Sequence, residues 1–237
     1  MKKLHIPEKI HKFIKIFAAV SMILSLNPVS FAMSPGSRDS VDRQLLFNGR
    51  IWRNLYSRVR GDQFLFTSDF LPGTVTINGK TFTGCSLRYD ICNDQLLTRA
   101  GQNIIIQLNK EMVTSFTMDY LLQTWKFMKI EGDTVNSPGG YGLVLYKGNT
   151  SLFVKYRKIV MLLAIDNKYD AFEQGQKLWL QKDGRFYQLS KTKDVIDLYP
   201  EKKQQINNFI RTQRLKVSRK RPESFIPLVE FCDKSGK

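Results

Sequence analysis

Three pairs of acidic residues are the first candidates for chemistry in this sequence. Two carboxylates about 5–10 Å apart can hydrolyse a glycoside, one acting as general acid and the other as base or nucleophile. The candidate pairs are Asp62 with Asp69, Asp90 with Asp94, and Glu131 with Asp133. All three lie where turns or strand edges are expected, and Asp is favoured there because it accepts hydrogen bonds from nearby backbone N–H groups. Asp90, Asn93 and Asp94 also offer oxygen ligands for calcium, but the twelve-residue ligand pattern is missing.

Ser190-Lys191-Thr192-Lys193 is a second candidate, because it matches the pattern S-x-x-K. In that pattern a lysine amine activates a serine nucleophile without histidine. The companion motifs Lys-Thr-Gly and Ser-Asp-Asn do not occur in the chain. We therefore interpret this segment as a turn that precedes a helix.

The N-terminal segment determines which residues the exported protein would have available for catalysis or metal binding. Residues 1–15 carry five lysines, an apolar run extends from Ile16 to Leu26, and Ser30-Phe31-Ala32 follows. This pattern is typical of a secretory signal peptide, and we predict cleavage between Ala32 and Met33. The apolar run is shorter than the roughly 20 residues that a spanning helix needs, so we predict no transmembrane span after cleavage.

Cleavage would remove His5 and His11, the two histidines, and leave 32 basic and 20 acidic residues with a net charge of +12. Without histidine a single chain cannot form a Ser-His-Asp or Cys-His nucleophile, and zinc sites with His ligands are excluded. We therefore expect a protein that is not an enzyme and uses no cofactor or metal. A hydrolase with paired carboxylates is the third-ranked alternative.

Basic residues give the strongest compositional signal, with 37 Lys and Arg against 21 Asp and Glu in the whole chain. Outside the inner membrane the abundant anions are lipid headgroups, lipopolysaccharide and acidic glycans rather than nucleic acid, so we expect no nucleic acid. The predicted binding residues are Arg50, Arg53, Arg58, Arg211, Arg214, Lys216, Arg219, Lys220 and Arg221. Trp52, Tyr56 and Trp125 could stack on sugar rings. The alternative is a solvated basic surface without a ligand.

Hairpin signals dominate the elements that would position these residues. Asn78-Gly79 and Asp183-Gly184 fit two-residue turns, because both turn positions need positive φ. Three further hairpins are predicted around Asn93-Asp94, Ala100-Gly101-Gln102 and Lys147-Gly148-Asn149-Thr150. They predict a mainly β fold. Its strands would form an antiparallel meander, arranged as a curved sheet or as an open barrel or sandwich, followed by two or three short C-terminal helices.

The domain plan follows from these signals. Residues 33–62 form a leader and a mixed segment, in which the helical spacing of Ile51, Leu55 and Val59 competes with a strand pair around Asn48-Gly49. Residues 63–190 form the meander and residues 191–237 a helical cap, and we expect one domain over residues 33–237. Helices are predicted at residues 194–198, from Pro200, and from Ser224.

The three cysteines are Cys85, Cys92 and Cys232. We predict small buried apolar residues, because free cysteine behaves as a small hydrophobe. The alternative is one disulfide between Cys232 and either of the other two, which an exported protein could form.

Several segments resemble an uncharacterised family of exported proteins of Bacteroidetes-type bacteria. The segments are FNGRIWRNLY, GDQFLFTSDFLPGTVTINGKTF, LRYDICNDQLL, LNKEMVTSF, VLYKGNTSLFVKY and PESFIPLVEF. The resemblance covers about residues 45–232 and implies a signal peptide, β-hairpins and a helical end, but no catalytic or ligand residue. Cys92 stands where this pattern has Tyr.

Together these patterns predict an exported, non-enzymatic protein of the cell envelope, periplasmic, associated with the outer membrane or extracellular. Its basic surfaces would contact anionic lipid, lipopolysaccharide, acidic glycan or an envelope protein. The alternative is a periplasmic carrier of an acyl chain or lipoprotein in a cavity of the curved sheet.

Overall fold

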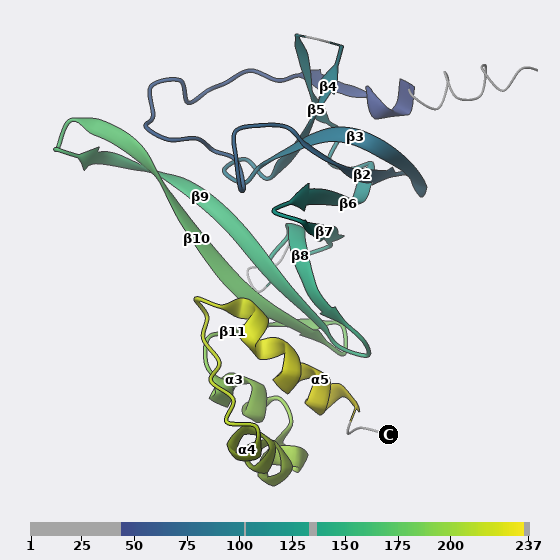
Figure 1. Ribbon diagram of the computed structural model, residues 1–237, viewed down its shortest axis with the longest axis vertical. Coiled ribbons are helices and arrows are strands. Elements are labelled where there is room, and N and C mark those ends of the chain that lie inside the picture. Colours follow the sequence, from purple (N-terminus) through teal and green to yellow (C-terminus); the bar gives the residue numbers. More distant parts are fainter. Residues whose placement is uncertain (1–43, 102, 133–136, 235–237) are drawn as a thin grey trace, which may run out of the picture. The chain divides into compact units, whose positions relative to one another are not determined.

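The computed structural model describes residues 44–101, 103–132 and 137–234, which belong to one compact unit, residues 42–237. The predicted signal peptide and its cleavage site at Ala32 and Met33 lie outside the described residues. The described residues form one antiparallel sheet followed by short helices, and the sheet does not close (Figure 1). This confirms the predicted fold class.

The strands are β1 (Gly49–Ile51), β2 (Leu71–Ile77), β3 (Lys80–Asp90), β4 (Gln95–Ala100), β5 (Ile104–Leu108), β6 (Val113–Tyr120), β7 (Gln123–Ile130), β8 (Gly140–Lys147), β9 (Ser151–Ile165), β10 (Tyr169–Lys182) and β11 (Arg185–Leu189). The helices are α3 (Thr192–Asp197), α4 (Lys203–Thr212) and α5 (Ile226–Lys234), with short 3-10 turns η1 (Pro200–Lys202) and η2 (Pro222–Phe225).

All five predicted hairpins are confirmed. Asn78 and Gly79 have φ of 49° and 80°, and Asp183 and Gly184 have φ of 50° and 75°, as the tight turns require. Three more hairpins among the described strands were not predicted: β6–β7, which turns at Leu121-Leu122, β7–β8 and β9–β10. The helices also begin and end near the predicted residues.

The strand order is β1-β5-β4-β3-β2-β6-β7-β8-β9-β10-β11, so the sheet is not the simple meander predicted. Strand β6 pairs with β2 although it follows β5 along the chain. The step from Leu108 to Val113 can span at most about 18 Å, whereas four strand spacings in a flat sheet measure about 19 Å. The five strands from β5 to β6 must therefore curl.

The mixed segment at residues 33–62 also differs from both predictions. Strand β1 begins at Gly49 and pairs with β5, with Gly49 opposite Leu108 and Ile51 opposite Ile106. Asn48-Gly49 is thus not a hairpin turn, and residues 52–62 are not helical. The strand conformation of residues 49–51 comes from their pairing with β5. The spacing of apolar residues along the sequence cannot indicate a partner strand more than fifty residues away.

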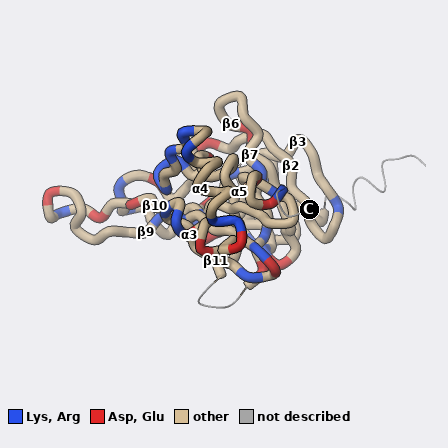
Figure 2. Tube along the Cα trace, turned by 90° about the horizontal axis from the view of Figure 1, so that it is seen from below, with Lys and Arg blue, Asp and Glu red and all other residues tan. Residues whose placement is uncertain are grey.

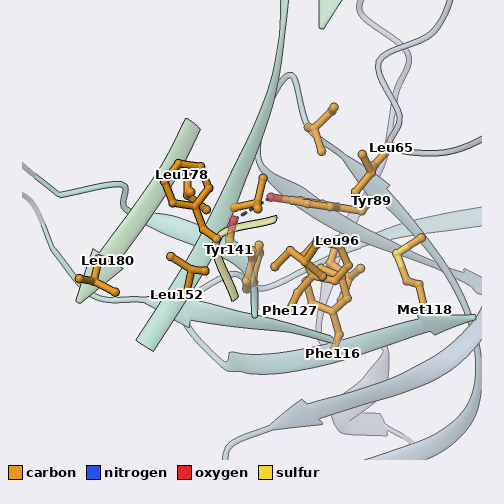
Figure 3. Packing of buried hydrophobic residues seen from close by; sticks show 14 of the residues in the cluster. Leu65, Tyr89, Leu96, Phe116, Met118, Phe127, Tyr141, Leu152, Leu178 and Leu180 are labelled. Carbon is orange, nitrogen blue, oxygen red and sulfur yellow. Dashed lines mark hydrogen bonds between the residues drawn. The ribbon is translucent and has the colours of Figure 1, made fainter. Parts of the chain in front are cut away.

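Aromatic rings fill the core between β3, β6, β7 and β8 (Figure 3). Phe116 stacks on Phe127 with ring centroids 4.7 Å apart, and Tyr89 meets both rings edge-on at 5.3 and 5.4 Å. Fully burying one such side chain stabilises a fold by roughly 1.5–3 kcal/mol. This cluster therefore holds the middle of the sheet together.

The helices cover one face of the β8–β11 part of the sheet and lie together near β11 (Figure 1). Buried Leu178 and Leu180 of β10 belong to the same core cluster as Ile206 of α4 and Leu228 of α5. Phe209 of α4 and Phe231 of α5 stack with centroids 4.2 Å apart. Phe231 is partly buried and packs against the core cluster.

Asp233 joins α5 to the sheet. Its carboxylate is 8% exposed and accepts hydrogen bonds from the Tyr146 hydroxyl at 3.0 Å and from the N–H groups of Asn149 and Thr150 at 2.8 and 2.9 Å. A Cβ on Gly148 would overlap this carboxylate, so the loop needs glycine there. The helical end thereby caps the β8–β9 loop.

Strands β9 and β10 continue past β8 as a two-stranded arm, which projects to the left in Figure 1. From Ile159 to Ile165 the β9 edge has no strand partner among the described residues except β10. Leu163 is left-handed with φ of 53°, and its N–H donates to Asp170 Oδ1 at 3.0 Å. A shift of register marks a bulge at this place.

Candidate functional site

A groove of about 1100 Å³ lies over β9, β10 and β11. The β3–β4 turn bounds one side and α3 lies at one end. The lining residues are Ile91, Cys92, Asn93, Asp94, Ser137, Pro138, Lys155, Tyr156, Arg157, Ile159, Glu173, Gln174, Gly175, Gln176, Lys177, Trp179, Phe186, Tyr187, Gln188, Leu189, Asp194 and Leu198.

Three cations share one face of this groove. Lys155 and Arg157 are two residues apart on β9, so they point to the same side. Lys177 of β10 lies directly opposite Lys155, and Gly175 lies opposite Arg157. Like charges directly opposite each other destabilise a strand pair unless a counter-charge intervenes. This face therefore favours an anion.

An aromatic floor lies beside the cations. Trp179 follows Lys177 on the same face and is 8% exposed, and its Nε1 has no hydrogen-bond partner among the described residues. Phe186 of β11 lines the same groove. Gly175 leaves bare backbone between the charged positions, with nothing within 4 Å of the position that a Cβ would take. The face thus combines flat apolar surface with positive charge.

A buried ion cluster of Asp94, Lys110, Lys155 and Tyr89, here called the Asp94 cluster, supports one wall of the groove. Lys155 Nζ lies 2.8 Å from Asp94 Oδ1, and Lys110 Nζ lies 2.6 Å from Oδ2. The Tyr89 hydroxyl also donates to Oδ1. Asp94 packs against Gly140, where a Cβ would overlap its carboxylate. Two lysines share one carboxylate, so the cluster carries a surplus positive charge.

Protonation states in the Asp94 cluster follow from burial and charge. Burial alone would raise the pKa of Asp94, but the charge of Lys155 and the hydrogen bonds from both lysines and Tyr89 outweigh it and lower that pKa. Burial lowers the pKa of Lys155, and Asp94 offsets part of this effect. Burial and the neighbouring Asp94 raise the pKa of Tyr89 well above its usual value. The favoured state is an ionised Asp94 with a neutral Tyr89.

Structural contacts engage three carboxylates of the predicted pairs. Asp90 is fully buried and its Oδ1 accepts hydrogen bonds from the N–H groups of Cys92 and Asn93, so it shapes the β3–β4 turn. Asp62 pairs with Lys158 at 3.1 Å. Asp94 is engaged by its lysines.

The remaining acidic residues of the predicted pairs are described only in part. Asp69 accepts a hydrogen bond from Thr67. Glu131 is exposed, and Asp133 lies outside the described residues.

The S-x-x-K segment is a helix start, as interpreted from the sequence. Asp194 Oδ2 accepts hydrogen bonds from the N–H groups of Ser190 and Lys191 at 2.7 and 2.9 Å. Among the described residues no group of three or more His, Cys, Asp or Glu side chains is placed to hold a metal ion.

The predicted basic residues fall into two groups along the chain. Arg50, Arg53 and Arg58 are exposed, and Arg50 borders a smaller hollow of about 410 Å³ beside β5. The second group begins at the end of α4 and continues through the segment after it, and most of its members are exposed. Figure 2 shows Lys and Arg positions close together around α4. Its members are Arg211, Arg214, Lys216, Arg219, Lys220 and Arg221. No described contact joins the two groups.

One part of the second group lies next to the groove. Gln176, which lines the groove, donates from Nε2 to the carbonyl oxygens of Arg219 and Lys220 at 3.0 and 3.4 Å. The groove cations Lys155, Arg157 and Lys177 were missed because they lie singly among strand residues. Side chains alternate between the two faces along β9 and β10, and this alternation could have placed Lys155, Arg157 and Lys177 on one face.

The aromatic residues predicted to stack on sugars contact other parts of the protein. Trp52 packs on Phe64 with centroids 5.9 Å apart, and the Tyr56 hydroxyl donates to Asn93. Trp125 packs on Phe66 at 4.9 Å. None of the three lines the groove.

The cysteines agree with the prediction of buried thiols rather than with a disulfide. Cys85 and Cys232 are buried, Cys92 is partly exposed, and none of them is bridged. The Cys85 thiol donates to the carbonyl oxygen of Phe82. Burial raises the pKa of the Cys232 thiol to about 11.

Comparison of the chain with protein-family models, with curated proteins and with solved structures gives no match in any of the three. No helix in the described part of the chain is long and apolar enough to cross a membrane.

Proposed function

We propose that the protein is an exported, non-enzymatic binding protein of the cell envelope that holds an anionic ligand in the groove. The ligand is an acidic glycan or the headgroup of an anionic lipid. The observation that carries the proposal is the placement of Lys155 directly opposite Lys177, with Arg157 on the same face and Trp179 beside them.

An anion between these cations would remove their repulsion. Lys155 already has Asp94 as a counter-charge, but Lys177 is exposed and belongs to no described ion pair. Asp194 is engaged by backbone N–H groups, and Glu173 lies two residues beyond Gly175 toward the arm. The groove cations that belong to no described ion pair are therefore Lys177 and Arg157. A carboxylate, sulfate or phosphate group is the chemistry that fits there.

The aromatic floor supports a ligand with an apolar face. Sugar rings present C–H groups that pack on Trp and Phe, and Trp179 and Phe186 lie within the groove. A groove of about 1100 Å³ is large enough for several sugar rings.

Charge-removal variants test the proposal. Lys177→Gln removes one exposed cation from the groove, and Lys126→Gln removes one from β7, where Lys126 is also exposed and outside the described ion pairs. Calorimetric titration at low salt uses polygalacturonate, glycerol phosphate and a fatty acid as probes. We expect Lys177→Gln to weaken binding of the acidic probes about 10-fold, because hydrogen bonds to charged groups contribute roughly 1.5–3 kcal/mol, while Lys126→Gln binds as the unchanged protein does.

The probes separate the alternatives. Preference for polygalacturonate identifies a glycan ligand and preference for glycerol phosphate a lipid headgroup. Binding of the fatty acid alone would favour the carrier. Equal effects of the two lysine variants, or no binding of either acidic probe, would refute the proposed groove ligand.

A further inference from the structure

The β6–β7 hairpin turns through two leucines in a conformation that leucine avoids. Leu121 and Leu122 have φ of 50° and 61°, and the pair Tyr120–Gln123 closes the hairpin next to them. Left-handed backbone is costly for residues with a large side chain, and asparagine or glycine normally occupies such turns. The same chain uses Asn78-Gly79 and Asp183-Gly184 for the same geometry elsewhere. The leucines are thus a local departure from the turn chemistry that this protein otherwise follows.

The two leucine side chains are also the most exposed large apolar groups of the described residues. Leu121 is 79% exposed and Leu122 is 110% exposed. They contribute nothing to the core, so packing within the protein does not explain them. Strain combined with exposure points to a contact outside the protein.

Aromatic rings lie directly behind the leucines. Phe66 stacks on Tyr120 with centroids 4.9 Å apart and meets Trp125 at the same distance. Trp125 Nε1 donates to the carbonyl oxygen of Tyr120 at 3.4 Å. The exposed Lys126 follows on β7. Behind the aliphatic tip the hairpin therefore carries an aromatic layer, with the carboxylate of Asp119 held by Thr124 at the same level, and then Lys126.

We propose that Leu121 and Leu122 insert into the surface of a lipid bilayer. The order aliphatic, aromatic, charged matches the order from acyl chains through the interface to the headgroups. The pairing of Tyr120 with Gln123 satisfies the backbone up to the turn itself, so few peptide groups enter the apolar region unpaired. The net charge of +12 that remains after the predicted cleavage adds attraction to anionic leaflets. This site is separate from the groove and does not depend on its ligand.

The test replaces the turn by the one the chain uses elsewhere. The variant is Leu121→Asn with Leu122→Gly, and its control is Leu55→Asn, which removes a leucine that is 78% exposed away from the hairpin. Flotation with phosphatidylcholine vesicles, with and without phosphatidylglycerol, measures the partition coefficient. We expect the double variant to lose on the order of 100-fold in partitioning, from the apolar area of two leucines. Its thermal midpoint should stay equal or rise, because the strain is relieved.

The unchanged protein and Leu55→Asn should float with both kinds of vesicle, and Trp fluorescence should shift to the blue because Trp125 reaches the interface. Lys177→Gln should keep its binding to neutral vesicles even if it loses the groove ligand. The proposal is overturned if the unchanged protein floats with neither vesicle, if the double variant floats as well as the unchanged protein, or if Leu55→Asn loses as much.

Discussion

Replacing Asp94 by Asn isolates the charge of the Asp94 cluster, because Asn keeps the size and one acceptor oxygen. Lys155, whose side chain is 16% exposed, would lose its counter-charge. Lys110, whose side chain is 36% exposed, would lose the same carboxylate as an ion-pair partner. Removing one partner of a buried ion pair costs about 3–5 kcal/mol. Because Asp94 is 22% exposed and Lys110 reaches solvent, we expect the lower end, about 3 kcal/mol.

Urea unfolding at pH 7 measures this cost. With a slope of about 2 kcal/mol per molar urea, the midpoint should fall by about 1.5 M. Asp183→Asn is the control, since Asp183 pairs with Lys182 at the surface with its side chain 82% exposed. Such exposed pairs contribute roughly 0–1 kcal/mol. Asn also tolerates the left-handed backbone of that turn.

The pH dependence gives a second readout. The pKa of Asp94 is lower in the folded state than in the unfolded chain, where a carboxyl titrates near about 3.9. Its stabilisation is therefore complete above the unfolded pKa and is lost as pH falls through the folded pKa. The unfolding curves of the two proteins should converge in acid. A cost no larger than that of Asp183→Asn, or a difference unchanged at acid pH, would refute the reasoning.

Three further predictions concern the frame around the groove. Asp233→Ala should lower the free energy of unfolding by about 2 kcal/mol in urea titration, because it leaves the N–H group of buried Thr150, and that of Asn149, without their acceptor. A loss under about 1 kcal/mol would contradict this. Gly140→Ala should lower the thermal midpoint by several degrees, because the added Cβ would overlap Asp94 and the backbone φ of residue 140 is 66°. An unchanged midpoint would show that Asp94 can move away from the added Cβ without loss of stability. The Cys232 thiol is buried, and burial raises its pKa to about 11. An alkylating reagent should therefore label it only after unfolding. Labelling of the folded protein would indicate that α5 opens away from the sheet.

Local turn chemistry made much of the sheet predictable from sequence. Asn78-Gly79 and Asp183-Gly184 specify their turns by backbone preference alone, and the flanking alternation supplies the strands. The β6–β7 hairpin was missed because Leu121-Leu122 carries no turn signal. Leucine is not a turn residue, so the sequence did not indicate this hairpin. The left-handed backbone that these leucines adopt is also the reason to consider them functional.

Non-local contacts set the limit for the rest. The pairing of β2 with β6 joins strands that are far apart in sequence, and no local pattern reports it. The groove is similar, because Lys155 faces Lys177 only after β9 and β10 pair. The exposure of the predicted arginines could be inferred from charge, but the contact of Arg219 and Lys220 with Gln176 of the groove depends on the fold.

The unpaired edge of the β9–β10 arm has a consequence for the behaviour of the protein in concentrated solution. A run of seven apolar residues, Ile159–Ile165, on an open edge is a template for adding strands from other molecules, which leads to aggregation. The left-handed Leu163 interrupts the ladder between β9 and β10, and its N–H group donates to Asp170, so the edge is bent at this bulge. We expect Asp170→Ala to form fibres sooner than the unchanged protein, because the bulge that protects the edge loses its hydrogen bond.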